Sequence, residues 1–333
     1  MKPTADVVYQ PSSVPALEDI AVPITGPIAE GEPDIIPGFL PRGGQLVIAG
    51  ETNVGKTLIA LETCSALTTG NPMWGDDSMK PAIQANKILY FLGEHYNEVL
   101  QRLWRKTGLP MSDQVWLIGP DKLAGDKWLV TGGKTNMVAI EKFCTWAQGA
   151  DLIIFDPLAA FISGVDVEND NAQMRLLLDA MSLVSQVSGA ACMILAHQGK
   201  PTIDKFGNER SRSKYAIRGA SAVEDAATNI FYMGKSDKDP AESKGWEVYN
   251  LTKRKYKGEA PDEFKLVRNP LTMAHTLLGD RPFVEVRKLA VQSMVGRVRH
   301  KFPDMKIGQV YSLISAVTEM SERSVERYME GKD

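Results

Sequence analysis

Eight residues near the start of the chain have the composition of a phosphate-binding loop. Residues 50 to 57 read GETNVGKT and directly follow the apolar run QLVIA. Gly50 and Gly55 let the backbone curl so that successive N–H groups point inward, and the positive end of a following helix reinforces them. The ammonium of Lys56 suits the β- and γ-phosphates, and the Thr57 hydroxyl suits Mg²⁺. We therefore predict an ATP and Mg²⁺ site formed by Gly50, Glu51, Thr52, Asn53, Val54, Gly55, Lys56 and Thr57.

Polar residues end three other apolar runs. DLIIFDP delivers Asp156 to a strand end, where its carboxylate is expected to hold the metal beside Thr57. In KILYFLGEHYNEV, Glu94 directly follows the apolar run and is the predicted base for an attacking water. In CMILAHQGK, His197 follows the apolar run and is placed to sense a γ-phosphate. Taken singly, each has an ordinary structural alternative: a strand-ending Asp, a helix-starting Glu and a hydrogen-bonded His. The phosphate loop favours the functional interpretation.

Two groups of basic residues occur later in the chain. LTKRKYKG contains Lys253, Arg254 and Lys255, of which the first and third share one face of a strand and the second faces the other side. A solvated basic edge strand is the alternative interpretation. The segment from Gln198 to Gly219 carries six cations against two acidic residues, and these cations are Lys200, Lys205, Arg210, Arg212, Lys214 and Arg218. Its composition favours a loop that follows the phosphates of single-stranded DNA, with a flexible surface loop as the alternative.

The elements that must position these side chains alternate along the chain. Five apolar runs, namely QLVIA, KILYFLG, DLIIFDP, ACMILAH and NIFYMG, are separated by helical stretches, which predicts an α/β fold with a mainly parallel central sheet flanked by helices. WEVYNLTKRKYKGEAPDEFKLVRN then reads as strand, turn and strand. We predict a proline-rich arm over 1–40, an ATPase core over 41–283 and a small helical segment over 284–333. The last of these resembles a helix-turn-helix with Ser321 as an N-cap.

Composition limits the class of protein. The chain has 333 residues, 44% of them hydrophobic, and a net charge of −3, which argues against a generally basic protein that coats nucleic acid. Its three cysteines lack the paired spacing of a zinc site and the density of a disulfide framework. No signal peptide or apolar run of membrane-spanning length is apparent, so we expect a cytoplasmic protein without a membrane partner.

The order of these features resembles a known family. A phosphate loop, a strand-ending Glu, a strand-ending Asp and a strand-ending His, followed by AIRGASAVEDAATNIFYMG, resemble the RecA-like ATPase core over roughly residues 35–270, and within it the RepA-like and DnaB-like hexameric replicative helicases. This resemblance implies that His197 couples nucleotide state to a DNA-binding loop. It also implies that a basic residue among Lys253, Arg254 and Lys255 reaches the γ-phosphate of a neighbouring subunit.

These observations favour one function and leave two alternatives. The expected protein is an ATP-dependent motor on single-stranded DNA, a homo-oligomeric ring that acts with other replication proteins of a plasmid or phage. A RecA-like recombinase or recombination mediator would share the same core but form filaments. An ATP-dependent switch that binds a protein partner would use the basic loop against an acidic protein surface.

Overall fold

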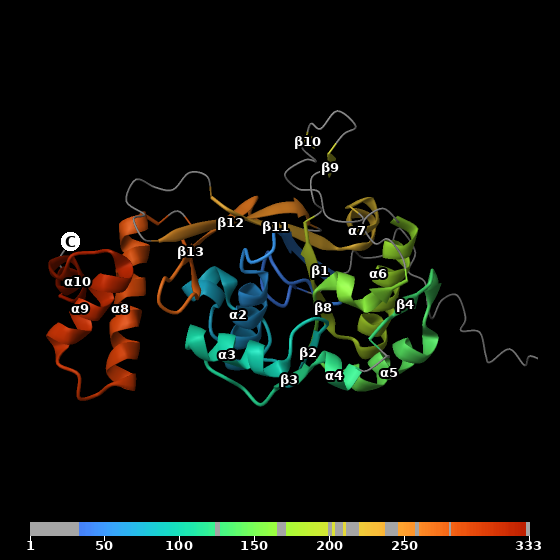
Figure 1. Cartoon of the computed structure of the whole chain (residues 1–333), viewed down its shortest axis with the longest axis horizontal. Coiled ribbons are helices and arrows are strands. Elements are labelled where there is room, and N and C mark those ends of the chain that lie inside the picture. The colour runs from blue at the N-terminus through green and yellow to red at the C-terminus, as the bar shows by residue number, and fades with distance from the viewer. Residues whose placement is uncertain are drawn as a thin grey trace, which may run out of the picture. The chain divides into compact units, whose positions relative to one another are not determined.

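A nine-stranded sheet forms the centre of the molecule (Figure 1). The computed structural model describes residues 33–123, 127–164, 171–198, 202–203, 209–210, 220–236, 246–256, 260–279 and 281–330. The strand order in the sheet is β14-β13-β12-β11-β1-β8-β6-β2-β3. From Pro33 onward the chain forms one compact unit. The predicted α/β class with a mainly parallel sheet flanked by helices is confirmed.

The six parallel strands make up the larger part of the sheet. Each consists largely of consecutive apolar residues, which suits strands that are covered on both faces. Five of them correspond to the five apolar runs of the sequence, whereas β3, a four-residue apolar run at the edge of the sheet with Trp116 exposed, was not predicted. Their bounds are β1 Gln45–Gly50, β2 Ile88–Leu92, β3 Val115–Ile118, β6 Leu152–Asp156, β8 Ala191–His197 and β11 Asn229–Lys235.

Three antiparallel strands extend the sheet beyond β11. They are β12 Glu247–Lys255, β13 Glu263–Arg268 and β14 His275–Leu277. The first two are the strands predicted on either side of the turn near residue 260. The ladder between β11 and β12 contains a register shift at Ile230 and Phe231. This bulge changes which side chains of β12 lie on each face.

Helices cover both faces of the sheet and create two separate cores. On one face α2, Lys56–Thr69, and α3, Asn97–Thr107, pack with alternate strand residues such as Ile48 and Ile154. On the other face the intervening strand residues, such as Phe155, pack against three helices. These helices are α5 Met137–Ala147, α6 Asn171–Ser188 and α7 Ala220–Ala226. The period-two alternation of each strand therefore decides which helical layer a side chain meets.

Three helices at the C-terminal end pack on the antiparallel part of the sheet. They are α8 Phe283–Lys301, α9 Ile307–Thr318 and α10 Glu322–Met329. Their apolar side chains form a third core with Trp246, Val248 and Val267. Ser321 caps α10, since its hydroxyl accepts a 3.2 Å hydrogen bond from the backbone N–H of Ser324. A DNA-reading role for α9 and α10 stays a prediction.

The remaining elements are short. They comprise α4 Pro120–Leu123, the strands β4 Val130–Thr131, β5 Lys134–Thr135, β7 Ile162–Ser163, β9 Thr202–Ile203 and β10 Glu209–Arg210, and the 3₁₀ turns η1 Met73–Gly75, η2 Asp77–Met79 and η3 Leu158–Phe161. Residues 1–32 of the predicted arm lie outside the described residues, whereas Ile36 and Phe39 are buried in the core beside α2. The boundaries proposed at 40 and 283 stay predictions. No helix in the described part of the chain has the length and hydropathy of a membrane span.

Candidate active site

The phosphate loop connects the end of β1 to the start of α2, as its sequence predicts. Gly55 takes φ 118°, in the left-handed region that favours glycine, and α2 begins at the next residue. Asn53 also has a positive φ, 64°. The N-terminus of α2 therefore follows a tightly curled loop, which is the arrangement that directs backbone N–H groups toward an anion.

Lys56 is buried at the start of α2. Its Nζ donates hydrogen bonds to the carbonyl oxygens of Gly50 at 3.0 Å and Glu51 at 2.7 Å, and lies 3.4 Å from Nδ1 of His197. Burial lowers the pKa of Lys56 to about 8, although the charges of Asp156 and Glu51 act in the opposite direction. His197 reaches this position because it pairs with Gly50 across β8 and β1.

Asp156 meets Thr57 at the carboxyl end of β6. Asp156 lies on the same face of the sheet as Ile154, which is the face covered by α2. Its Oδ2 accepts a 3.0 Å hydrogen bond from the Thr57 hydroxyl and a 2.7 Å hydrogen bond from the Tyr90 hydroxyl. Burial raises the pKa of Asp156, and the two hydrogen bonds and the nearby charge of His95 only partly oppose that rise. The predicted pairing of Thr57 with Asp156 is present.

Tyr90 is a site residue that the sequence analysis missed. Burial is the main cause that raises its pKa well above the ordinary value, with the charge of Asp156 adding to it. A tyrosine in the middle of a buried strand is a usable signal, because its hydroxyl requires a hydrogen-bond partner. The partner was not predictable, since Asp156 lies on a neighbouring strand 66 residues away in the sequence.

Glu94 follows β2 at the same edge of the sheet. The N–H of Gly93 donates a 2.8 Å hydrogen bond to the carbonyl oxygen of Asp156, which fixes the chain directly before Glu94. The Glu94 side chain is exposed. Strand order thus brings the loop lysine, the strand-ending Asp156 and Glu94 to one edge, although these residues come from three separate segments.

The residues at this edge fit ATP and Mg²⁺. Oxygen ligands are those that Mg²⁺ prefers, and in nucleotide sites it uses one or two protein ligands together with phosphate oxygens. The Thr57 hydroxyl and the buried Asp156 carboxylate, 3.0 Å apart, supply such a pair. A cation would also offset the cost of burying Asp156. Among the described residues no cluster of three or more His, Cys, Asp or Glu is placed to hold a metal ion, so the fit depends on this pair.

The basic residues of β12 all have partners within the chain. Lys253 forms a 2.8 Å ion pair with Asp262, Arg254 a 3.0 Å ion pair with Glu224, and the ammonium of Lys255 donates to the carbonyl oxygen of Glu224. The expectation that Lys253 and Lys255 share one face of β12, with Arg254 on the other, is wrong, because their two partners are consecutive residues of β11 and lie on opposite faces. Phe231 pairs with Lys253 and Ile230 with Lys255, so Arg254 is the extra residue of the bulge. Action of any of the three on a neighbouring subunit stays a prediction.

The predicted DNA-binding residues fall almost entirely outside the described part of the chain. Only the backbone of Arg210, in β10, is described. The others that lie outside it are Lys200, Lys205, Arg212, Lys214 and Arg218. The segment that carries them starts directly after β8, and the N–H of Gln198 donates a 3.0 Å hydrogen bond to the carbonyl oxygen of Gly50. Its first residue is thus tied to the phosphate loop.

Comparisons with known proteins give one matching family and a similar solved structure. The model of a family described as an AAA domain matches residues 26–202, which is more than half of the chain. The crystal structure of flagellar accessory protein FlaH from Methanocaldococcus jannaschii is similar over 72% of this chain and 90% of that chain, with 12% sequence identity and a TM-score of 0.46. No curated protein matches the sequence.

Proposed function

The chain belongs to the AAA domain family of P-loop ATPases, and we propose that it is an ATP-hydrolysing motor that moves along or unwinds DNA. In its finer form the proposal is a ring-forming replicative helicase of the plasmid or phage type. Nucleotide chemistry belongs to the site at the ends of β1, β2 and β6. DNA contact belongs to the basic segment after β8. Different experiments test the two parts.

Four side chains divide the hydrolytic chemistry. Lys56 binds the β- and γ-phosphates, whose negative charge stabilises its buried ammonium. Thr57 and Asp156 hold Mg²⁺, whose charge neutralises the phosphate oxygens when it is bound. Glu94 is exposed at the neighbouring strand end, where its carboxylate accepts a proton from the attacking water.

The observation that carries the motor proposal is the position of His197. Its ring lies 3.4 Å from the ammonium of Lys56, and the basic segment begins within three residues of it. A displacement of Lys56 when the phosphates change would therefore alter its contact with His197 and shift the first residues of the segment that would hold DNA. Six cations in that segment supply the phosphate contacts that single-stranded DNA binding needs.

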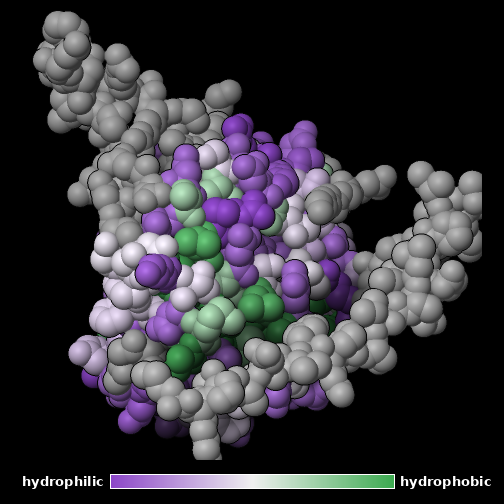
Figure 2. All heavy atoms as spheres, turned by 90° about the vertical axis from the view of Figure 1, so that its right-hand side faces the viewer, coloured by the Kyte–Doolittle hydropathy of each residue, from purple (hydrophilic) through white to green (hydrophobic). Residues whose placement is uncertain are grey.

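Assembly into a homo-oligomer is part of the proposal. Figure 2 shows apolar areas among polar ones on the side of the molecule that carries α5 and α6. The exposed large apolar side chains of these two helices are Met137, Val138, Leu183 and Val187. Apolar side chains gathered on one face are a feature of protein interfaces. A second copy of the chain is the partner proposed for this face.

ATP hydrolysis with and without single-stranded DNA tests the motor. We expect measurable hydrolysis that rises when DNA is added, and loss of at least about 100-fold in Lys56→Ala because the phosphate countercharge is removed. The matched control is Lys80→Ala, an exposed lysine outside the site, which should hydrolyse ATP at the wild-type rate. A rate of ATP hydrolysis that does not change when DNA is added would favour the protein-partner switch over a motor.

Salt-dependent DNA binding tests the basic segment. Replacing Arg210, Arg212 and Lys214 by Ala should weaken single-stranded DNA binding and lower the slope of log affinity against log salt by about two. Replacing Arg299 and Lys301 of α8 is the control and should change neither value. If the substitutions in the segment and those in α8 weakened DNA binding equally, the proposal that the segment is the DNA site would be wrong. Strand displacement and images of rings or filaments then separate a helicase from a recombinase.

A further inference from the structure

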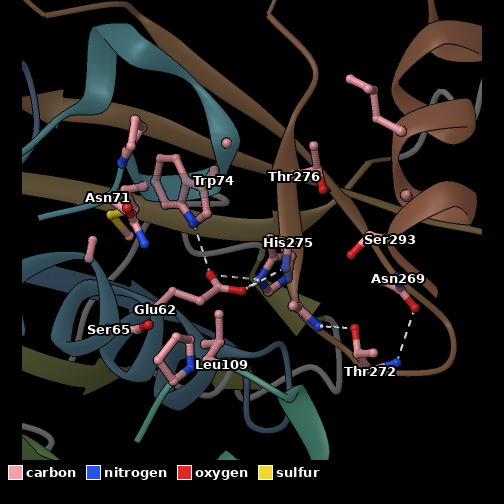
Figure 3. Close-up of a pocket in the computed structure, with 18 of the residues that line it drawn as sticks. Glu62, Ser65, Asn71, Trp74, Leu109, Asn269, Thr272, His275, Thr276 and Ser293 are labelled. Atoms are coloured by element: carbon pink, nitrogen blue, oxygen red, sulfur yellow. Dashed lines mark hydrogen bonds and ion pairs between the residues drawn. The ribbon is translucent and has the colours of Figure 1, made fainter. Parts of the chain in front are cut away.

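A second cavity, of about 390 Å³, is lined by residues other than those of the phosphate loop (Figure 3). It is enclosed by the second half of α2 with the turn that follows, the hairpin before β14, and α8. Ser65, which lines it, is eight residues beyond Thr57, or roughly 12 Å along the helix axis. None of residues 50–57 lines the cavity, but the two sites adjoin, because α2 contributes to both and the His275 ring lies next to Gly55.

The floor of the cavity is a buried polar cluster. The carboxylate of Glu62 accepts hydrogen bonds from the indole of Trp74 at 2.8 Å and from the backbone N–H of His275 at 2.6 Å, and Nδ1 of His275 lies 3.1 Å from both of its oxygens. The His275 side chain is fully buried. Its Nε2 has no hydrogen-bond partner among the described residues. Because this nitrogen has almost no accessible surface, it is not a ligand-binding atom of the cavity, and the cluster supports the floor from below.

Two guanidinium groups line the same cavity. Arg297 donates to the carbonyl oxygen of Thr107, and no described carboxylate forms an ion pair with it. Burial lowers the pKa of Arg297, as expected for a cation that lacks a countercharge. Arg281 forms a 3.7 Å ion pair with Asp76 and donates a hydrogen bond to the carbonyl oxygen of Leu277. Within the described part of the chain, Arg297 is therefore the guanidinium of this lining that has no carboxylate partner.

Backbone strain gathers at the edge of the cavity. Trp74 and Met273 have φ values of 57° and 64°, in the left-handed region that side chains rarely adopt. Trp74 lines the cavity, and Met273 belongs to the tight turn between Asn269 and Ala274, two other lining residues. Strained backbone of this kind is concentrated at binding sites.

We propose that this cavity binds a small anionic ligand, one that carries a phosphate or carboxylate group. The anion lies against Arg297, whose guanidinium has no carboxylate partner among the described residues. Figure 3 shows Ser65 and Asn71 on one side of the cavity and Ser293 on the other, so that hydroxyl and amide groups are available to orient the rest of the ligand. Phosphate and carboxylate groups are both anionic, and the calorimetric titration below distinguishes them.

Calorimetric titration of the Lys56→Ala chain tests the site, because that variant removes the phosphate-binding lysine of the other site. Sodium pyrophosphate and sodium citrate are titrated separately. Saturable binding of one molecule per chain, with a Kd below about 1 mM, is expected for at least one of them. Binding of pyrophosphate alone identifies a phosphate-bearing ligand, binding of citrate alone a carboxylate-bearing one, and binding of both the shared anion chemistry.

Two variants locate that binding. Arg297→Gln should weaken it at least about tenfold, because a charged donor becomes neutral, whereas Arg299→Gln, two residues later on the exposed side of α8, should leave it unchanged. Ser293→Trp fills the cavity from an exposed position and should also abolish binding, even if Arg297→Gln lowers stability. No binding of either anion up to about 10 mM would overturn the proposal. Binding that survives both Arg297→Gln and Ser293→Trp would equally overturn it.

Discussion

Burying the ammonium of Lys56 lowers the free energy of unfolding by an amount that depends on pH. Its pKa of about 8 lies below the ordinary value of 10.5. Between these values the unfolded chain binds more protons than the folded chain, so stability rises with pH across that window. In the absence of nucleotide we expect the free energy of unfolding to gain about 2 to 3 kcal/mol from this group between pH 8 and pH 10.5.

Chemical denaturation of three chains measures that gain. The rise should be smaller in Lys56→Met by the stated amount, whereas Lys80→Met, which removes an exposed lysine, should keep it. Parallel pH profiles for the wild type and Lys56→Met would show that the lysine does not titrate in this range.

The hydroxyl of Tyr90 should stabilise the folded protein through its hydrogen bond to Asp156. Tyr90→Phe leaves Oδ2 of Asp156 with Thr57 as its one remaining donor among the contacts described, and we expect a loss of about 1 to 3 kcal/mol in the free energy of unfolding. Tyr311→Phe, at a partly exposed position on α9, is the control and should change stability by less than about 0.5 kcal/mol. Equal effects of the two substitutions would contradict a special role for Tyr90.

The end of β2 and the turn η3 pack without space for a side chain between them. A Cβ built on Gly93 would lie 2.1 Å from Cβ of Ala160, so Gly93→Ala must displace the chain that carries Glu94. We expect a stability loss of about 1 to 3 kcal/mol and slower ATP hydrolysis. Restoring the space with Gly93→Ala combined with Ala160→Gly should recover most of both.

A glycine in open space provides the control for that substitution. Gly234→Ala, in β11, meets no atom within 4 Å and should be close to neutral. If Gly93→Ala hydrolyses ATP at the wild-type rate, the packing of β2 on η3 does not position Glu94.

Local patterns predicted those elements whose signals lie within a few residues. The phosphate loop, the five apolar strands and the Ser321 cap are examples, because backbone curvature, burial and capping are determined locally. The arrangement around Arg254 was not predictable, since it depends on a bulge set by pairing with β11. The contact of Glu62 with His275 joins residues 213 positions apart, and no local pattern reports such a contact.

Mixed oligomers test whether a basic residue of β12 acts on a neighbouring subunit. Lys56→Ala and Arg254→Ala are each expected to be inactive alone, but co-expressed in equal amounts they should recover about a quarter of the wild-type rate. The reason is that a quarter of the interfaces pair an intact Lys56 with an intact Arg254. Co-expression of Lys56→Ala with Glu94→Gln should recover nothing, because both residues belong to the same subunit's site. Absence of recovery in the first mixture would assign Arg254 to its contact with Glu224 alone.

The antiparallel extension of the sheet has a mechanical consequence. From β1 to β14 every strand is hydrogen-bonded to the next, across four steps that span about 19 Å. A continuous ladder of this kind resists bending, because relative movement of its strands would break several hydrogen bonds at once. The phosphate loop and the floor of the second cavity are therefore attached to the same rigid sheet. If the proposed motor is right, its movements are carried by the segments that join strand ends, and the one after His197 starts beside a ring that lies 3.4 Å from the ammonium of Lys56.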